Sequence, residues 1–266
     1  MKKILIFSGK FIAAFSFIII FQQIGFYMLP DEGHLLFPAM ALATLYMIFI
    51  FDKDKKLNLG LNVNPGQHLH GILAGVILIS LSFYFIKLSG ALQIVNHQFT
   101  FAHVSNLIYL FVLFFIVSFQ EELFFRGYLY SLADNLFSDP KISILLTSFL
   151  FSITHAANPN ALSSPVPLLN IFLAGFLLGF FRLYSKGIWM PIGFHWSWNF
   201  LQGGFFGFEV SGISLKSILQ IEPSQNHWLS GGQFGAEGSI ITTLLFLVTI
   251  AGYWFIFQNR KKDSSK

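Results

Sequence analysis

Long apolar runs separated by short polar connections divide this chain from one end to the other. A helix needs about 20 apolar residues, each rising 1.5 Å, to cross the hydrocarbon core of a bilayer. Runs of this length recur along the whole sequence, and they predict a bundle of about eight transmembrane helices. The expected spans are residues 8–29, 33–51, 69–89, 104–130, 141–157, 167–184, 188–207 and 238–258.

The composition supports a membrane protein and excludes a soluble globule. Of the 266 residues, 55% are hydrophobic and 11% are charged, whereas soluble domains carry roughly 25% charged residues. The mean hydropathy is +0.66. The apolar N-terminal run lacks the small-residue cleavage pattern of a signal peptide, so it is interpreted as a retained first span. We therefore expect an all-α, polytopic bundle that forms one integral membrane domain over residues 1–266.

Basic residues cluster in alternate connections, which predicts the orientation. The positive-inside rule places such clusters in the cytoplasm, so both termini are expected there. The net charge of +4 is spread over these clusters, and no nucleic-acid partner is expected. The clusters are Lys2 and Lys3; Lys53, Lys55 and Lys56; Arg126 and Lys141; Arg182 and Lys186; and Arg260, Lys261 and Lys262. Among the other connections, 30–33, 90–103, 158–167 and 208–238, the only lysine or arginine is Lys216.

A few ionisable side chains fall well inside the expected spans. On insertion scales each charge at a helix centre costs about 2.5–3.5 kcal/mol, and such groups face a protein interior or a water-filled cavity. They are functional by default. The residues are Glu121, Glu122 and Arg126 in the fourth span, His155 in the fifth and His195 in the seventh, with Asn199 as a neutral polar neighbour.

The spacing of these residues predicts their pairing. Glu122 and Arg126 are four residues apart and share a helix face. Glu121 lies about 100° round the helix without an evident local cation. His195 and Asn199 also share a face. Water between a carboxylate and an imidazole can lose its proton to either group, and an amide can stabilise a developing oxyanion.

These residues alone leave three functions open. One is a peptidase that activates water, another is a proton-coupled transporter, and the third is a non-catalytic scaffold in which the polar groups only join helices. A glutamate–arginine pair or a single histidine is more often structural than functional. The convergence of polar groups from three separate spans favours a functional site.

Three ordered motifs carry a resemblance to a known family. The stretch EELFFR fits EExxxR, FSITH fits FxxxH and HWSWN fits HxxxN, all within residues 115–205. In order and spacing they resemble the CAAX protease and bacteriocin-processing (CPBP, or Abi) family, whose members are intramembrane proteases. The resemblance implies cleavage of a membrane-associated peptide or lipidated peptide. The lack of cysteine, the short loops and the small size favour a bacterial inner membrane, and a bacterial chain would argue against a CAAX substrate.

The resemblance also implies roles for individual residues. Glu121 would be the essential carboxylate that acts on water, and His155 would cooperate with it. His195 and Asn199 would stabilise the oxyanion or hold the water or a metal ion.

The remaining motif residues, Glu122 and Arg126, would shape the catalytic site. The chain has no cysteine, so a metal could be bound only by His, Asp, Glu or carbonyl groups. His155, His195 and Glu121 would complete a three-ligand Zn²⁺ centre with one open position. A metal-free mechanism driven by the glutamate is the alternative.

Residue counting raises a conflict about depth. At 1.5 Å per residue, Glu121 and His195 fall in the cytoplasmic halves of their spans, whereas His155 falls near the outer end of the fifth. Either a fifth helix that starts deeper, near Leu145, or a strong tilt of the helices would resolve the conflict. The long connection 208–238 is expected to cap the outer face or to be mobile, and Trp198 to pack at the lipid interface.

Overall fold

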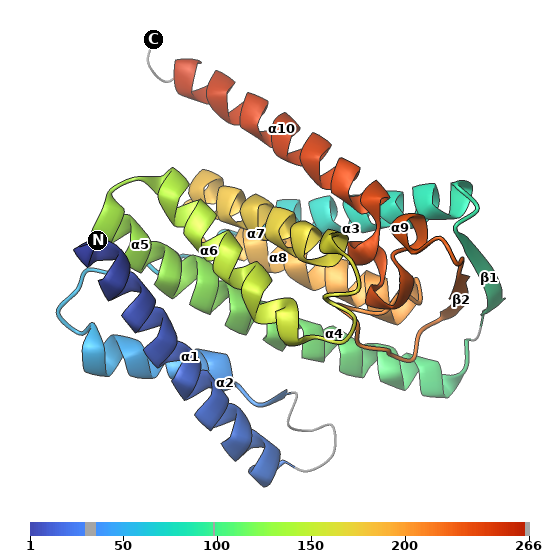
Figure 1. Cartoon of the computed structure of the whole chain (residues 1–266), viewed down its shortest axis with the longest axis horizontal. Helices are drawn as coiled ribbons and strands as arrows, with labels where there is room; N and C mark the ends of the chain where they lie inside the picture. Colours follow the sequence, from blue (N-terminus) through green and yellow to red (C-terminus); the bar gives the residue numbers. More distant parts are fainter. Residues whose placement is uncertain (30–35, 98, 264–266) are drawn as a thin grey trace.

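The computed structural model describes residues 1–29, 36–97 and 99–263. The chain forms a bundle of helices (Figure 1), which confirms the predicted all-α, polytopic fold. The first expected outer connection, residues 30–33, lies outside the described residues. The helices are α1 (Lys2–Met28), α2 (Ala39–Tyr46), α3 (Pro65–Leu88), α4 (Phe101–Glu122), α5 (Tyr130–Phe137), α6 (Pro140–Thr154), α7 (Pro165–Ser185), α8 (Trp189–Asn199), α9 (His227–Ser230) and α10 (Ile240–Asp263), and the strands are β1 (Leu92–His97) and β2 (Leu219–Pro223).

Every expected span coincides with helical structure, but the helices differ in length. Within the described residues, five helices are long and apolar enough to cross a membrane, and Ala39–Phe51 and Ile240–Ile256 are shorter apolar helices. The seventh expected span consists of α8 and a π-helical continuation, Phe200–Phe205.

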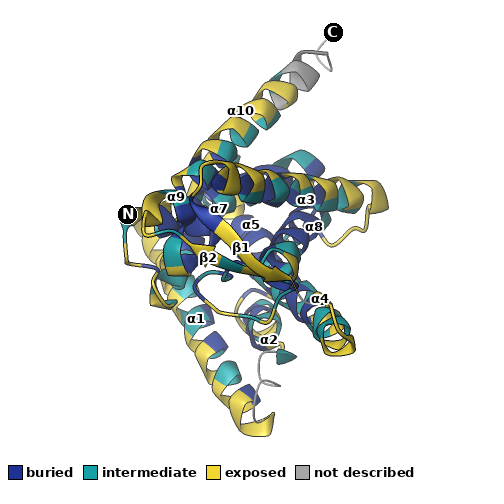
Figure 2. Ribbon diagram, turned by 90° about the vertical axis from the view of Figure 1, so that its right-hand side faces the viewer, coloured by how far each residue is buried: buried dark blue, intermediate teal, exposed yellow. Residues whose placement is uncertain are grey.

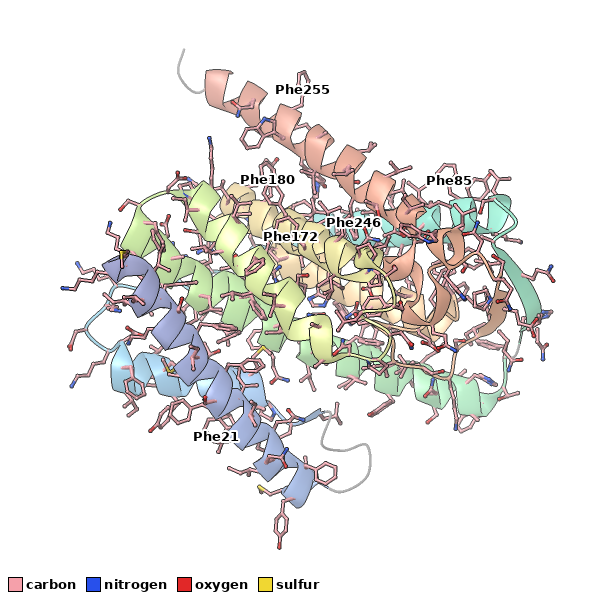
Figure 3. All side chains as sticks on the ribbon, viewed as in Figure 1. Phe21, Phe85, Phe172, Phe180, Phe246 and Phe255 are labelled. Carbon is pink, nitrogen blue, oxygen red and sulfur yellow. The ribbon has the colours of Figure 1, made fainter. Side chains whose placement is uncertain are left out.

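The outer helices present apolar side chains to their surroundings. In Figure 2 much of α1 and α10 is exposed, whereas α8 lies at the buried centre. Phe255 on α10 is 67% exposed, whereas Phe180 on α7 and Phe246 on α10 are about 1% exposed (Figure 3). Exposed aromatic and aliphatic side chains of this kind suit a lipid environment.

Glycines set the closest helix contacts. Gly175 and Gly179 on α7 let α6 approach closely, since an added Cβ would lie 3.1 Å from the Cα of Ser148 and 3.1 Å from Ile144 respectively. On α3, a Cβ at Gly71 would lie 2.1 Å from the backbone oxygen of Met190 on α8. Small residues permit such contacts between membrane helices.

The fourth span is longer than predicted, and this resolves the conflict about depth. It runs without a break from Phe101 through α4, the π-helical segment Leu123–Leu129 and α5 to Phe137. Sixteen residues separate Glu121 from Phe137, about 24 Å of helix, and fifteen separate Pro140 from His155, about 22 Å. The two side chains therefore reach the same depth. The predicted end near residue 130 was wrong. A fifth helix that starts near Leu145 was also wrong, because α6 begins at Pro140, next to the first expected bound at residue 141.

Two connections that were expected on the outer face join in a structure that the sequence did not predict. β1 pairs with β2 in antiparallel register, Leu92 opposite Pro223, at the end of the bundle that also carries α9 (Figure 1). This pairing ties the connection after α3 to the one before α10. Residues 206–239 therefore form an ordered cap rather than a mobile segment.

Candidate active site

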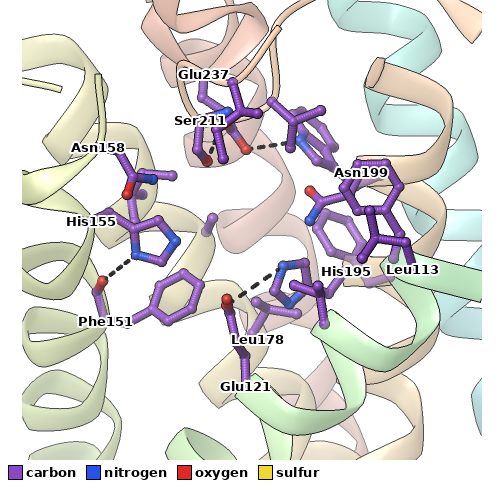
Figure 4. Close-up of a pocket in the computed structure, with 18 of the residues that line it drawn as sticks. Leu113, Glu121, Phe151, His155, Asn158, Leu178, His195, Asn199, Ser211 and Glu237 are labelled. Atoms are coloured by element: carbon purple, nitrogen blue, oxygen red, sulfur yellow. Dashed lines mark hydrogen bonds and ion pairs between the residues drawn. The ribbon is translucent and has the colours of Figure 1, made fainter. Parts of the chain in front are cut away.

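Polar side chains from distant parts of the sequence surround one cavity of about 180 Å³. Glu121, His155, His195 and Asn199 all line it, as Figure 4 shows. The helices α4, α6, α7, α8 and α10 contribute the walls, which are otherwise largely apolar. The expected convergence of these four side chains is therefore present as one shared cavity, and their roles stay a prediction.

Glu122 and Arg126 lie behind the cavity wall and fix the orientation of His195. Both side chains are fully buried. Oε1 of Glu122 accepts hydrogen bonds from Nη1 of Arg126 and from Nδ1 of His195, each at 3.0 Å. Nη2 of Arg126 donates to the carbonyl of Gly175 at 3.0 Å. The predicted Glu122–Arg126 pair is thus confirmed, and it joins α4 to α7 and α8.

Glu121 and His195 face each other across a short gap. Oε2 of Glu121 lies 3.9 Å from Nε2 of His195, beyond direct hydrogen-bond distance. Within the described residues, this oxygen is buried without a hydrogen-bond partner. The Glu122 carboxylate accepts the hydrogen of Nδ1 of His195. Nε2, on the other side of the ring, faces Glu121. A carboxylate with an unused lone pair and an imidazole nitrogen therefore border the same small space.

His155 lies on the opposite side of the cavity, at the point where α6 ends and a 3₁₀ turn begins. Its Nδ1 lies 2.7 Å from the carbonyl oxygen of Phe151. Since a carbonyl only accepts, Nδ1 carries a hydrogen, and Nε2 of the neutral ring keeps its lone pair. The Phe151 ring lies 4.6 Å from the His155 ring and 4.4 Å from the guanidinium of Arg126. Phe151 therefore separates His155 from this cation.

The motifs coincide with changes in helix geometry. The helix becomes π-helical directly after Glu122 and again after Asn199, and it tightens to 3₁₀ at His155. Such local changes are frequent at functional sites, because they turn side chains away from the regular helical spacing. Here each change directly follows or includes a motif residue.

Three further cavity residues were missed or misinterpreted from the sequence: Glu237, Ser211 and Trp198. Glu237 is the one charged residue in GGQFGAEGSI, directly before the last span, and that isolation is the signal that could have drawn attention to it. Trp198 was expected at the lipid interface, but it is 3% exposed and its Nε1 donates to Glu237 at 3.3 Å. Burial raises the pKa of Glu237, although hydrogen bonds from Ser211 oppose this effect.

His155, His195 and Glu121, the residues expected to bind zinc, are not gathered into a metal-binding cluster in the structure. Over the described ranges, no three His, Cys, Asp or Glu side chains come close enough together to hold a metal ion. Nδ1 of His155 and Nδ1 of His195 both donate to oxygen acceptors, so Nε2 of each ring is the nitrogen that a metal ion could take. Zinc dependence stays a prediction.

Comparisons with known proteins assign the region that carries the motifs. Residues 103–201 match a family model described as Rce1-like, "Type II CAAX prenyl endopeptidase Rce1-like". A search of curated proteins finds no match to the chain. The matched region includes all three motifs and ends before the cap, so Glu237 lies outside it.

Proposed function

We propose that this chain is an intramembrane endopeptidase that uses Glu121 to activate water, because the region that carries the motifs matches the Rce1-like CAAX endopeptidase model. The observation that carries the proposal is the gap between Glu121 and His195. An unpartnered carboxylate oxygen and an imidazole nitrogen lie 3.9 Å apart beside an apolar cavity. A water molecule in this gap can bridge the two groups.

The chemistry follows from these positions. Glu121 takes a proton from the water as the water oxygen bonds to the peptide carbonyl carbon. The carbonyl oxygen becomes an oxyanion, and His195 and the amide of Asn199 lie on the wall that would face it. When the C–N bond breaks, the leaving nitrogen takes the proton from Glu121. Water and the peptide bond thereby become a carboxyl group and an amine.

The other motif residues support this step. Nε2 of His155 supplies a second basic nitrogen on the far side of the cavity. Glu122 and Arg126 touch neither the water position nor the cavity; they hold His195 in orientation through Nδ1. Under this assignment Glu122 is a positioning residue rather than a catalytic one.

The cavity favours a peptide with apolar side chains or a lipid attachment. Leu113, Phe114, Leu178 and Phe246 line it, and these surfaces suit a substrate that is delivered from the bilayer. The substrate class follows the family's description, a prenylated or otherwise membrane-associated peptide. The distribution of lysine and arginine favours a cytoplasmic location of both termini. The lack of cysteine, the short loops and the small size favour a bacterial inner membrane.

The test is comparative peptidomics of membranes that contain the native protein or the Glu121→Gln variant. Glu222→Gln serves as the matched control, because Glu222 is exposed on β2. The native protein and the control should yield the same cleaved peptides, and these should disappear with Glu121→Gln. Proton flux is measured in vesicles in parallel. Identical peptides in all three membranes, or a flux that Glu121→Gln abolishes without any cleavage, would refute the peptidase assignment.

A further inference from the structure

Glu237 is a buried carboxylate in the same cavity, and the proposed mechanism gives it no role. It lies in a 3₁₀ turn, Ala236–Gly238, at the end of the cap and just before α10. In Figure 4 its side chain enters the cavity beside Ser211, on the side away from Glu121. It is 6% exposed.

Both carboxylate oxygens of Glu237 accept hydrogen bonds from two different parts of the fold. Oε2 accepts from the backbone N–H of Ser211 at 3.0 Å and from its hydroxyl at 2.9 Å. Oε1 accepts from Nε1 of Trp198 on α8 at 3.3 Å. An indole N–H and a backbone N–H can only donate. A carboxylate suits this arrangement, whereas a glutamine amide would turn its NH₂ group toward one of the donors.

The backbone around Glu237 is fixed independently of its side chain. The amide of Asn170 on α7 donates to the carbonyls of Glu237 and Ser239, at 2.7 and 2.9 Å. A Cβ at Gly238 would lie 2.2 Å from the backbone oxygen of Gly231, so this turn is closely packed. The carboxylate is therefore held in place before it engages Ser211 and Trp198.

The segment that Glu237 holds is a wall of the cavity. Val210, Ser211, Ile213 and Leu215 all line it. The other hydrogen-bond partner of Glu237, Trp198, directly precedes Asn199. The carboxylate thus joins residues 210–215 to the helix that carries two of the motif residues. This wall lies outside the region that matches the family model.

We propose that Glu237 is a positioning residue that locks segment 210–215 onto α8, and that this segment selects the apolar substrate side chain next to the scissile bond. The family's motifs supply the chemistry, and the cap supplies a recognition wall of this chain's own. The selectivity part of this inference rests on the proposed function. The clamp, by which we mean the hydrogen bonds of Glu237 to Ser211 and Trp198, does not depend on it.

Limited proteolysis tests the clamp without using activity. Lys216 is the one lysine or arginine between residues 208 and 238, and it is exposed. Trypsin cleavage after Lys216 is followed by mass spectrometry on the purified full chain. Glu237→Gln should speed this cleavage by about tenfold, the scale expected from losing a buried charge-assisted hydrogen bond. Ser211→Ala, which keeps the backbone donor, should speed it less, and Glu222→Gln should leave it unchanged.

Kinetics test the selectivity. The probes are internally quenched peptides, with and without a farnesyl group, that differ in the size of one apolar residue beside the cleaved bond. For Glu237→Gln we expect KM to rise about tenfold while kcat changes by less than about threefold, and the preference among side chains to flatten. Ser211→Ala should give the same pattern more weakly, which guards against a variant that merely misfolds.

The outcomes separate the two proposals. Unchanged trypsin cleavage in Glu237→Gln would overturn the clamp, and an unchanged side-chain preference would overturn its role in selection. A loss of kcat with KM and preference intact would also overturn it, because Glu237 would then act on the reaction itself. If the native protein cleaves no probe and no membrane peptide, the proposed function fails, whereas the trypsin comparison still decides the clamp.

Discussion

Substitution by glutamine is expected to lower the stability of the protein at Glu122 but not at the adjacent Glu121. Glu122 is fully buried and compensates the fully buried Arg126 at 3.0 Å. In Glu122→Gln, the guanidinium would keep the Gly175 carbonyl, the Phe125 and Phe151 rings and the charge of Glu121, but it would lose its directly bonded carboxylate. Removing one partner of a buried ion pair typically costs about 3–5 kcal/mol. The variant should therefore unfold at a temperature about 6–20 °C lower, at about 2–4 °C per kcal/mol.

Glu121→Gln should instead leave stability within about 0.5 kcal/mol of the native value, because its carboxylate makes no comparable ion pair and its side chain is 19% exposed. Thermal unfolding of the purified protein in detergent measures both variants. A double-mutant cycle with Arg126→Met should recover part of the loss in Glu122→Gln, since the buried cation is then absent. Equal unfolding temperatures for Glu121→Gln and Glu122→Gln would refute this assignment of roles.

Three further predictions concern other parts of the molecule. Burial alone would raise the pKa of Asp52, but hydrogen bonds from Lys55, Lys10 and Tyr128 outweigh it and lower the pKa. Asp52 therefore adds stability above about pH 4 that is lost as the pH falls through its folded pKa, and unfolding curves of Asp52→Asn should lack this acid-dependent loss. Gly71→Val should lower thermal stability by about 1–3 kcal/mol, because its side chain would meet the α8 backbone. If zinc is required, a chelator should abolish peptide cleavage and added Zn²⁺ should restore it; cleavage that persists would leave the metal-free route.

Much of the fold was predictable because lipid imposes a strict rule on the sequence. Backbone groups inside a bilayer must be satisfied within a helix, so each apolar run of sufficient length predicts a span. The boundaries were less certain. The fourth helix continues to Phe137 because residues beyond 130 remain helical and buried against their neighbours, Leu132 and Ala133 being 0% exposed. Hydropathy alone does not reveal such packing.

The site was only partly predictable, for a different physical reason. Glu121, His155 and His195 stand out because ionisable groups are rare within spans, and Glu122 and Arg126 because their spacing predicts a pair. That Glu122 would also bond His195 depends on how α4 and α8 cross. The pairing of β1 with β2 and the role of Glu237 arise in polar connections, where a glutamate is unremarkable until the fold buries it.

The division of the site between helices and cap has a consequence for how such a protein can change its substrate. Glu122 on α4 accepts hydrogen bonds from Arg126 and from His195 on α8, and Arg126 also donates to the backbone of α7. A substitution of Glu122 or Arg126 leaves a buried charge without its partner and disturbs this group. Residues 210–215 instead reach the cavity from a connection held by the neutral donors of Ser211 and Trp198 on one carboxylate. Side chains such as Ile213, which is 51% exposed, can therefore vary at little cost to stability, so the wall can change while the reacting groups stay fixed.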